Sequence, residues 1–311
     1  MSHILRSIKD LARPLVYAIR KRHLKRKLLA NLVHSNLKYK FTIKDVDLYV
    51  QEKFTHLSMC VTESTENSEL VIANVNNKKI FWPASLTVRD LPWLYHEIFD
   101  DFSKNPSSYN HPKLDYENRA WVIDAGAAEG YFSIFAIEKT PGKLICIEPL
   151  TLMKEALEKT LGIYKKDRSA IVVDAALSDS LGWSEIRLDN EHICDSKLVS
   201  TMDADAILTE LNTTTYKVPI TTLDQLNIEY SLGVGGLIKM DIEGYEMAAL
   251  KGAQNLMKIY KPTLAIAVYH QLENAKLCAE IIKAANSEYQ IEFRGYFGYE
   301  QPPRPYMLFA Y

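Results

Sequence analysis

Three residues that follow predicted strands have the side chains that proton transfer requires. Asp241 ends an apolar segment at residues 237–241, and Glu243 comes two positions later. His270 follows a second apolar segment at residues 263–268. A carboxylate can remove a proton, orient an acceptor or bind a metal ion, and neutral imidazole is a base near pH 7. We expect Asp241 and Glu243 to be catalytic and His270 to be a second candidate for the base.

A structural role is the alternative for these three residues. Carboxylates favour the positive end of a helix, so both acids could simply begin one. A lone histidine often caps a helix or packs against neighbouring side chains, which is the alternative for His270. No residue is assigned as a metal ligand, and a divalent metal at the two carboxylates is left open.

The segment after another apolar strand has the features of a nucleotide-binding loop. Asp124 ends that strand, and the loop from Gly126 to Gly130 opens a helix. Glycine lets the backbone approach a ligand closely, and free N–H groups at a helix start present a positive end. The spacing is G-x-x-x-G, which lacks the G-x-G-x-x-G arrangement that places a pyrophosphate on the helix terminus. A ligand without phosphates, such as the sulfonium S-adenosylmethionine, fits better, and the acidic Asp124 suits its positive charge.

One acidic residue after the next strand could bind a ribose. Glu148 stands in Ile147-Glu148-Pro149, where its carboxylate can accept hydrogen bonds from both ribose hydroxyls. Such a residue serves NAD as well as S-adenosylmethionine, and a glycine loop alone can be an ordinary turn. An NAD-dependent oxidoreductase is therefore one alternative, although the phosphate-binding G-x-G is missing. A non-catalytic cofactor-binding module is another.

These residues need a sheet whose strands end at one edge, and the second half of the chain predicts one. From Trp121 onward, short apolar segments alternate with helical patterns, which is typical of an α/β fold with a parallel sheet covered on both faces. The predicted strands are residues 121–124, 143–147, 170–174, 237–241, 263–268, 290–293 and 306–311. The predicted helices lie near residues 130–139, 151–162, 246–258 and 271–286.

The first 35 residues form a strongly basic segment. Between Ile4 and Ile19, apolar residues recur at helical spacing beside the positive charge, although Pro14 should kink or divide the helix. We predict a basic amphipathic helical segment over residues 1–35. It either packs on the rest of the protein or contacts an anionic membrane surface or a partner.

Residues 36–118 are predicted to form a smaller accessory region in front of a cofactor-binding domain at residues 119–311. The pattern indicates a hairpin at residues 70–82 that turns at 74–77. A helix at residues 91–102 and a polar loop at 103–118 follow.

Composition restricts the classes of function. A chain of 311 residues with 47% hydrophobic side chains can bury one large core, and its net charge of -2 gives no general attraction for nucleic acid. The four cysteines form no C-x-x-C pair, which argues against a zinc ribbon or a disulfide scaffold. No run approaches the roughly 18 apolar residues of a membrane span. We expect a cytoplasmic protein, with any membrane contact peripheral and made through residues 1–30; the oligomeric state is not predicted.

Three blocks of sequence carry a family resemblance. They read D-A-G-A-A-E-G-Y-F-S at residues 124–133, T-T-L-D-Q-L at 221–226 and I-K-M-D-I-E-G-Y-E at 238–246, the last continuing to L-K-G-A at 250–253. Over residues 118–275 the chain resembles the FkbM family of methyltransferases, within the Rossmann-like class I that uses S-adenosylmethionine. One departure is Ala128-Glu129, where the family commonly has an asparagine.

The resemblance implies a fold, a cofactor and a reaction. The fold is a seven-stranded, mostly parallel sheet whose last strand is antiparallel, with helices on both faces, and the reaction is O-methyl transfer from S-adenosylmethionine to a hydroxyl. The resemblance is compatible with several hydroxylated acceptors. We expect a sugar of a surface or lipid-linked glycan, the lipid-linked option being motivated by the basic N-terminus, and a hydroxylated secondary metabolite is the alternative. The expected cofactor contacts are Asp124, Gly126, Ala127, Glu129, Gly130, Tyr131 and Phe132 for the methionine part, Glu148 and Pro149 for the ribose, and Asp174 and Ala175 for the adenine. Core packing is the alternative for Phe132, and a helix cap or turn is the alternative for Asp174.

Overall fold

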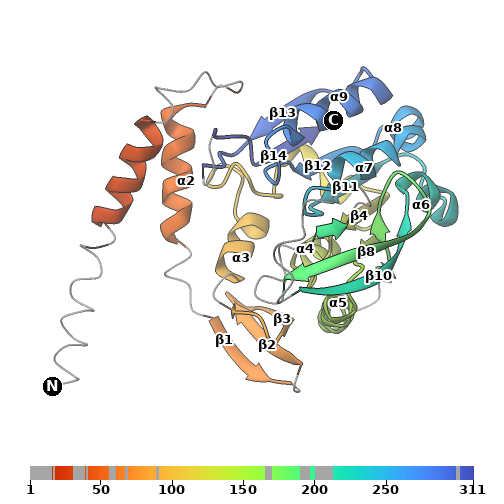
Figure 1. Ribbon diagram of the computed structural model, residues 1–311, viewed down its shortest axis with the longest axis horizontal. Coiled ribbons are helices and arrows are strands. Elements are labelled where there is room, and N and C mark those ends of the chain that lie inside the picture. The colour runs from red at the N-terminus through yellow and green to blue at the C-terminus, as the bar shows by residue number, and fades with distance from the viewer. Residues whose placement is uncertain are drawn as a thin grey trace.

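The computed structural model places the predicted strands in one central sheet (Figure 1). It describes residues 16, 18–30, 39, 41–55, 61–66, 69–88, 91–164, 170–189, 197–199, 213–298 and 302–311. Seven strands pair in the order β13-β14-β12-β11-β4-β5-β6. Their bounds are β4 (Trp121–Ala125), β5 (Lys143–Ile147), β6 (Ala170–Val173), β11 (Gly236–Met240), β12 (Thr263–Ala267), β13 (Ile291–Arg294) and β14 (Met307–Ala310).

The sheet is parallel except for the last strand in sequence. Strand β14 pairs antiparallel with both of its neighbours, whereas the pairs among β12, β11, β4, β5 and β6 are parallel. Every residue of β4, β11 and β12 is buried, because both faces of these central strands are covered. The predicted Rossmann-like α/β fold, with seven strands and an antiparallel last strand, is confirmed.

Helices cover both faces and create two cores. Side chains alternate along a strand, so Val122 packs with Phe132 in one apolar cluster and Ile123 packs with Leu250 in the other. The helices of the first core are α4 (Tyr131–Lys139) and α5 (Thr151–Tyr164). Those of the second are α6 (Leu223–Tyr230), α7 (Glu246–Lys251), α8 (Gln254–Tyr260) and α9 (Asn274–Ala285).

The helix predicted at residues 246–258 is two helices, with a break at Gly252 and Ala253. A Cβ on Gly252 would lie 2.2 Å from the carbonyl oxygen of Ser178, so the chain passes there in close contact with a neighbouring loop. The backbone N–H of Asp224 donates to the Gly252 carbonyl at 2.8 Å, and the Asp224 carboxylate accepts from the first turn of α8. The 221–226 block therefore caps the second helix.

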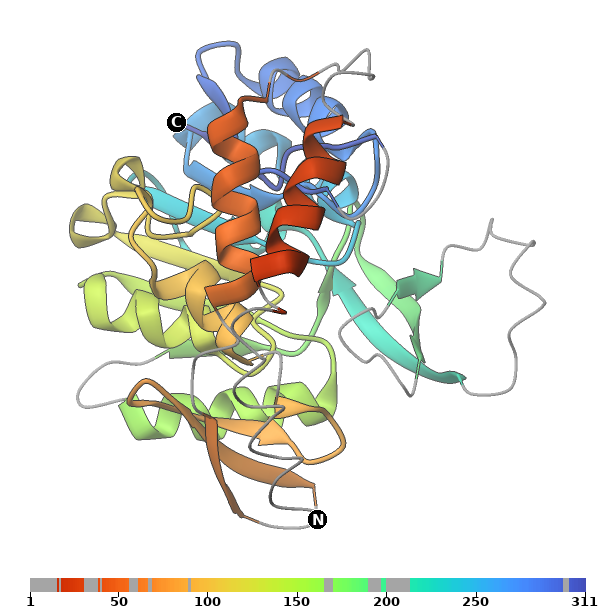
Figure 2. The ribbon, with the colours of Figure 1, turned by 90° about the vertical axis from the view of Figure 1, so that its left-hand side faces the viewer.

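A small mixed sheet after β6, in which β7 and β10 are parallel and the other pairs antiparallel, was not predicted. Its strands are β7 (Ala176–Leu177), β8 (Gly182–Asp189), β9 (Lys197–Val199) and β10 (Thr213–Thr221), in the order β7-β10-β8-β9. Ile186 and Val218 pack with Ala176 on its buried side. Figure 2 shows β8 and β10 extending away from the main sheet.

The accessory region contains the predicted hairpin and helix. A three-stranded sheet comprises β1 (Val61–Thr65), β2 (Leu70–Val75) and β3 (Lys78–Pro83), and α3 (Leu91–Phe99) follows. The hairpin turns at Asn76 and Asn77, which have φ of 48° and 66°. The predicted loop contains two short 3-10 helices, η3 (Pro112–Leu114) and η4 (Tyr116–Asn118). The division of the chain at residues 35 and 118 stays a prediction.

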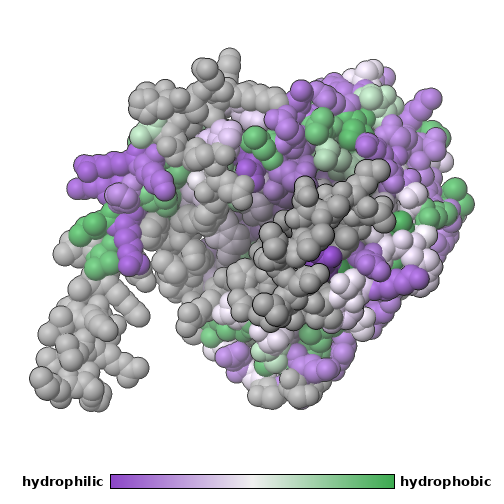
Figure 3. Space-filling model, in the orientation of Figure 1, coloured by the Kyte–Doolittle hydropathy of each residue, from purple (hydrophilic) through white to green (hydrophobic). Residues whose placement is uncertain are grey.

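Two helices near the N-terminus lie side by side (Figures 1 and 2). Residues 18–30 are helical, and Leu28 packs against Val46 and Val50 of α2 (Ile43–Thr55). Lys25 forms an ion pair with Asp47. Figure 3 shows hydrophilic and apolar surface together on the helix at 18–30. Part of the basic segment is thus helical and packed, while the predicted apolar stripe before Val16 lies outside the described residues.

None of the helices in the described part of the chain combines the length and the apolar character that a membrane span needs.

Candidate active site

A cavity of about 310 Å³ lies at the carboxyl ends of β4, β5 and β11. This is the edge at which open parallel sheets bind ligands, and the volume is in the range of small-molecule sites. The predicted residues that line it are Gly126, Ala127, Glu129, Tyr131, Phe132, Glu148, Pro149, Ala175, Asp241 and Glu243.

The glycine loop passes directly against the end of β11. Gly126 has φ of +73°, and a Cβ at this position would lie 1.9 Å from the carbonyl oxygen of Asp241. Gly130 has φ of +96° and stands at the N-cap of α4. Glycine is therefore required at Gly126 by both the backbone conformation and the close approach. The loop and the Asp241 turn form a continuous wall of the cavity.

Asp124 lies behind this wall and does not line the cavity. Its carboxylate is fully buried, lies 3.0 Å from Lys239 Nζ and accepts a hydrogen bond of 2.6 Å from Ser133 Oγ. Lys239 in turn donates to the Gly126 carbonyl at 2.7 Å. Burial raises the pKa of Asp124, although Lys239 and Ser133 lower it. This geometry disfavours direct contact between Asp124 and a cationic ligand, because the negative charge of Asp124 already pairs with Lys239.

Glu148 supports the loop and faces the cavity. Its Oε2 accepts from the N–H of Ala128 and its Oε1 from that of Leu150, both at 2.9 Å. Only 5% of the residue is exposed, and burial raises its pKa to about 7. Each carboxylate oxygen keeps a lone pair, so both can accept a further hydrogen bond. This arrangement of two acceptors suits a ribose diol, whose two hydroxyls can each donate a hydrogen bond.

The two residues expected at the adenine are placed differently. Ala175 lines the cavity, as does Pro149. The Asp174 carboxylate is about half exposed, forms an ion pair with Lys154 of α5 and does not line the cavity. Its charge is directed at the surface, so a structural role fits Asp174 better than a ligand contact.

The remaining loop residues line the cavity from the side of α4. Glu129 is 5% exposed, and burial raises the pKa of its carboxyl to about 7. Tyr131 and Phe132 begin the helix, and the Phe132 ring meets Tyr109 edge-on at 5.3 Å between centroids. Phe132 therefore both packs in the core and faces the cavity.

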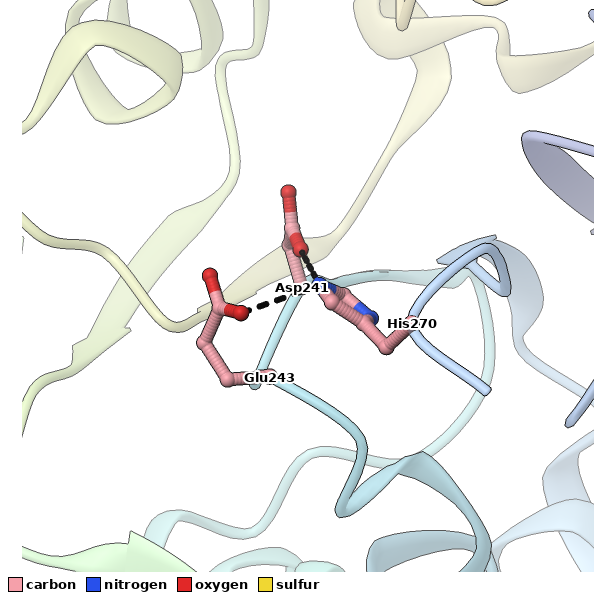
Figure 4. A group of neighbouring side chains, drawn as sticks. All are labelled: Asp241, Glu243 and His270. Atoms are coloured by element: carbon pink, nitrogen blue, oxygen red, sulfur yellow. Dashed lines mark ion pairs between the residues drawn. The ribbon is translucent and has the colours of Figure 1, made fainter. Parts of the chain in front are cut away.

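Asp241, Glu243 and His270 lie close together (Figure 4), and the two acids line the cavity whereas His270 does not. The Nε2 atom of His270 is 3.3 Å from Asp241 Oδ1 and 3.3 Å from Glu243 Oε2. Glu243 and Gly244 both have positive φ, 55° and 97°, and so turn the chain back toward the histidine. The structure thus brings together the three residues that sequence singled out for proton chemistry.

Glu246 supports His270 on the ring nitrogen that faces away from Asp241 and Glu243. It is fully buried, and its Oε1 lies 3.2 Å from His270 Nδ1 and accepts from the N–H groups of Ile242 and Gly244 at 3.2 Å. Asn274 donates to its Oε2 at 3.0 Å. Sequence indicated only a helix residue here, whereas the structure makes Glu246 the support of the histidine.

The carboxylates around His270 bear on its candidacy as the base. Burial lowers the pKa of the imidazole, but contacts with Glu243 and Glu246, and the charge of Asp241, together raise it well above its ordinary value. These neighbours therefore favour the protonated form of the imidazole, and the role of His270 as a second candidate for the base stays a prediction.

Several cavity residues were not predicted because they come from other parts of the chain. Trp93, Leu94, Glu97 and Ile98 of α3 line it, as do Lys239, Tyr245, Tyr269 and Tyr306. Tyr109, in the predicted polar loop, donates to Asp241 Oδ2 at 3.4 Å. The one available signal was Lys239, a charged residue inside an otherwise apolar strand.

Comparison with known sequences identifies the domain that carries this site. The profile described as Methyltransferase FkbM domain matches residues 124–296, which is more than half of the 311 residues. No curated protein matches the chain.

Solved methyltransferase structures are similar to the chain at low identity. The methyltransferase FkbM from Methylobacillus flagellatus KT is 21% identical, with a TM-score of 0.49 over 72% of this chain and 52% of that one. The precorrin-6y C5,15-methyltransferase from Geobacter metallireducens GS-15 is 13% identical, with a TM-score of 0.37 over 64% and 83%. The magnesium protoporphyrin IX methyltransferase from Synechocystis PCC 6803, with bound SAM, is 11% identical, with a TM-score of 0.36 over 62% of this chain and 69% of that one. The chain spans about half the length of the first of these proteins.

Proposed function

The chain belongs to the FkbM family of S-adenosylmethionine-dependent methyltransferases, and we propose that it methylates a hydroxyl oxygen of a sugar. S-adenosylmethionine supplies an electrophilic methyl group on a sulfonium. The observation that carries the proposal is that Asp241 and Glu243 face the same cavity as the glycine loop and Glu148. Cofactor-binding and proton-accepting groups therefore share one enclosed space.

The loop end of the cavity suits the cofactor. In our proposal, the backbone from Gly126 to Gly130 contacts the methionine part and Glu148 accepts both ribose hydroxyls. Ala175 contacts the adenine. Asp124 acts on the cofactor site indirectly, because it holds Lys239 against the carbonyl of Gly126.

The opposite end suits the acceptor. The attacking hydroxyl oxygen forms a bond to the methyl carbon in line with the breaking carbon–sulfur bond, and the hydroxyl proton passes to a carboxylate. Asp241 takes this proton in our proposal, with Tyr109 orienting its Oδ2 and Glu243 orienting the acceptor. His270 positions the two carboxylates, since its Nε2 lies 3.3 Å from an oxygen of each.

The cavity wall supports a sugar as the acceptor. Trp93, Tyr269 and Tyr306 provide aromatic surface on this side, and the carboxylates of Glu97 and Glu243 can accept hydrogen bonds from ring hydroxyls. A hydroxylated secondary metabolite is the second candidate, and it would use the same groups.

The basic helix supports an acceptor at a membrane. Arg20, Lys21 and Arg22 are exposed on it beside Ile19, which is 61% exposed. Basic and apolar residues together favour an anionic lipid surface. We propose that this helix brings the enzyme to a lipid-linked glycan by peripheral contact.

The test is transfer of labelled methyl from S-adenosylmethionine to fractionated glycans, glycolipids and small hydroxylated metabolites. We expect label in the carbohydrate, as a methyl ether that survives mild base. Label confined to non-carbohydrate metabolites would replace the acceptor class, and label on nitrogen or carbon would contradict O-methylation.

A further inference from the structure

We propose that Asp241, Glu243 and His270 bind a divalent transition-metal ion beside the acceptor end of the cavity. The catalytic use of this ion rests on the proposed function, while its binding does not. One acid from the end of β11, one from the following turn and one imidazole from the loop after β12 converge on a single point (Figure 4).

The distances fit three ligands on one face of a metal ion. One ligand atom from each residue can be chosen so that all three lie within 4.8 Å of one another, and His270 Nε2 is 3.3 Å from an oxygen of each acid. Ligands about 2.1 Å from a metal, at tetrahedral or right angles, stand about 3.0–3.4 Å apart. Small side-chain rotations would bring both oxygens and the nitrogen onto one ion.

Two of the ligand atoms are buried without a hydrogen bond. Asp241 Oδ1 and both ring nitrogens of His270 have no hydrogen-bond partner among the described residues, and the His270 side chain is only 8% exposed. Buried polar atoms normally have a hydrogen-bond partner, so two adjacent buried atoms without one indicate that a ligand binds between them. A cation between them satisfies both.

The neighbour of His270 on its other side provides an independent argument. Nδ1 is 3.2 Å from Oε1 of the buried Glu246, which two backbone N–H groups and Asn274 hold in place. A carboxylate on one ring nitrogen fixes the proton there and leaves the other nitrogen free to ligate, as in carboxylate–histidine–metal triads. If His270 only formed ion pairs with Asp241 and Glu243, it would not need the Glu246 carboxylate at its Nδ1.

The ligand set selects the class of metal. One imidazole with two carboxylates suits Mn²⁺, Fe²⁺, Co²⁺ or Zn²⁺, because Mg²⁺ and Ca²⁺ prefer oxygen alone. Positions on the cavity side remain for the acceptor hydroxyl, whose pKa a bound cation lowers. The hydroxyl proton then passes to Oδ2 of Asp241, the oxygen that also accepts from Tyr109, while the new oxygen–methyl bond forms and the carbon–sulfur bond breaks.

The test uses the full chain, stripped with a chelator, and Mn²⁺ alone as the probe. Calorimetry gives the affinity, and pulsed electron paramagnetic resonance reports coupling between Mn²⁺ and an imidazole nitrogen. We expect one bound ion with nitrogen coupling. Glu243→Gln and His270→Gln should each weaken binding by about 10–100-fold, and His270→Gln should remove the nitrogen coupling.

A matched control is His111→Gln. His111 is also a buried histidine, with Nε2 3.7 Å from a Glu292 oxygen, but it does not belong to the group formed by Asp241, Glu243 and His270. We expect this variant to bind Mn²⁺ like the wild type. Glu243 is one-third exposed, so its variant should fold even if the His270 variant does not.

Two results would overturn the metal site. One is no Mn²⁺ binding by the wild type, and the other is equal binding by the wild type and Glu243→Gln. The outcome is separable from the proposed function: methyl transfer without Mn²⁺ binding rejects only the metal, whereas Mn²⁺ binding without affinity for S-adenosylmethionine rejects the methyltransferase role.

Discussion

Gly126 and Asp241 meet so closely that a Cβ on the glycine would lie 1.9 Å from the aspartate carbonyl oxygen. The N–H of Asp241 also donates to the carbonyl of Ala125 at 3.1 Å, so the two strand ends are joined by a hydrogen bond as well as by contact. The loop proposed to hold the cofactor and the acid proposed to take the proton are therefore fixed relative to each other. Because both contacts involve the backbone of Asp241, a displacement of one backbone segment should move the other.

Gly126→Ala should disturb both ends of the cavity. The residue has a left-handed conformation and no room for a methyl group, so we expect a loss of at least about 2 kcal/mol in unfolding free energy and at least tenfold weaker binding of S-adenosylhomocysteine. Gly162→Ala is the control, because no atom lies within 4 Å of its added Cβ on helix α5. That variant should be unchanged or slightly more stable. Denaturant unfolding measures the stability of the two variants, and calorimetry measures their affinity for S-adenosylhomocysteine. Equal stability and equal affinity of the two variants would contradict the close contact.

Lys239→Met should destabilise the protein through Asp124. The change leaves a fully buried carboxylate without its cation, which costs about 3–5 kcal/mol. Adding Asp124→Asn to the same chain should recover part of that loss. Lys143→Met, which removes an exposed lysine, should cost less than about 1 kcal/mol. Urea unfolding of the wild type and these three variants measures the differences, and a double variant no more stable than Lys239→Met would argue against the pair.

The buried Glu129 should make stability fall with rising pH. Burial raises its pKa from 4.5 to about 7 in the folded protein, so the folded state binds the proton more tightly than the unfolded state does. Below about pH 4.5 both states are protonated, and stability is lost as pH rises from there through about 7. Relative to the wild type, Glu129→Gln should therefore gain on the order of 2 kcal/mol in unfolding free energy between pH 4.5 and 8. A difference independent of pH would show that Glu129 keeps an ordinary pKa.

The basic helix should bind anionic lipid. Replacing exposed Arg20, Lys21 and Arg22 with glutamine should weaken sedimentation with phosphatidylserine vesicles at least tenfold and leave cofactor binding intact. The control replaces three exposed lysines far from this helix in sequence, Lys251, Lys258 and Lys283, and should bind vesicles like the wild type. Equal loss in both variants would indicate only a general charge effect.

The sequence predicted the parts of the fold that repeat a simple pattern. Strands such as β4 and β11 are short runs of mainly apolar residues, and the glycine loop between β4 and α4 follows from residue types alone. The break at Gly252 could not be predicted, because its cause is contact with Ser178 and Asp224, which are distant in the chain. The small sheet of β8 and β10 was missed since its strands carry exposed residues such as Trp183 and Tyr216.

The same distinction applies to the site. Asp241, Glu243 and His270 were found because each follows a strand that ends at one edge of the sheet. Tyr109 and Trp93 were not, because irregular chain and the accessory helix bring them to the cavity by tertiary packing. The role of Asp124 depended on a partner, Lys239, that only the folded strand pair reveals.

Methyl transfer by Asp241→Asn, measured with cofactor binding in the same preparation, tests the central claim most directly. The side chain keeps its size, and Asp241 touches the acceptor end of the cavity, where it can be neutralised without removing the groups that hold the cofactor. We expect transfer from labelled S-adenosylmethionine to the glycan acceptor to fall at least 100-fold. The affinity for S-adenosylhomocysteine should change less than threefold. Transfer at the wild-type rate by the variant, or the absence of cofactor binding in the wild type, would contradict the account.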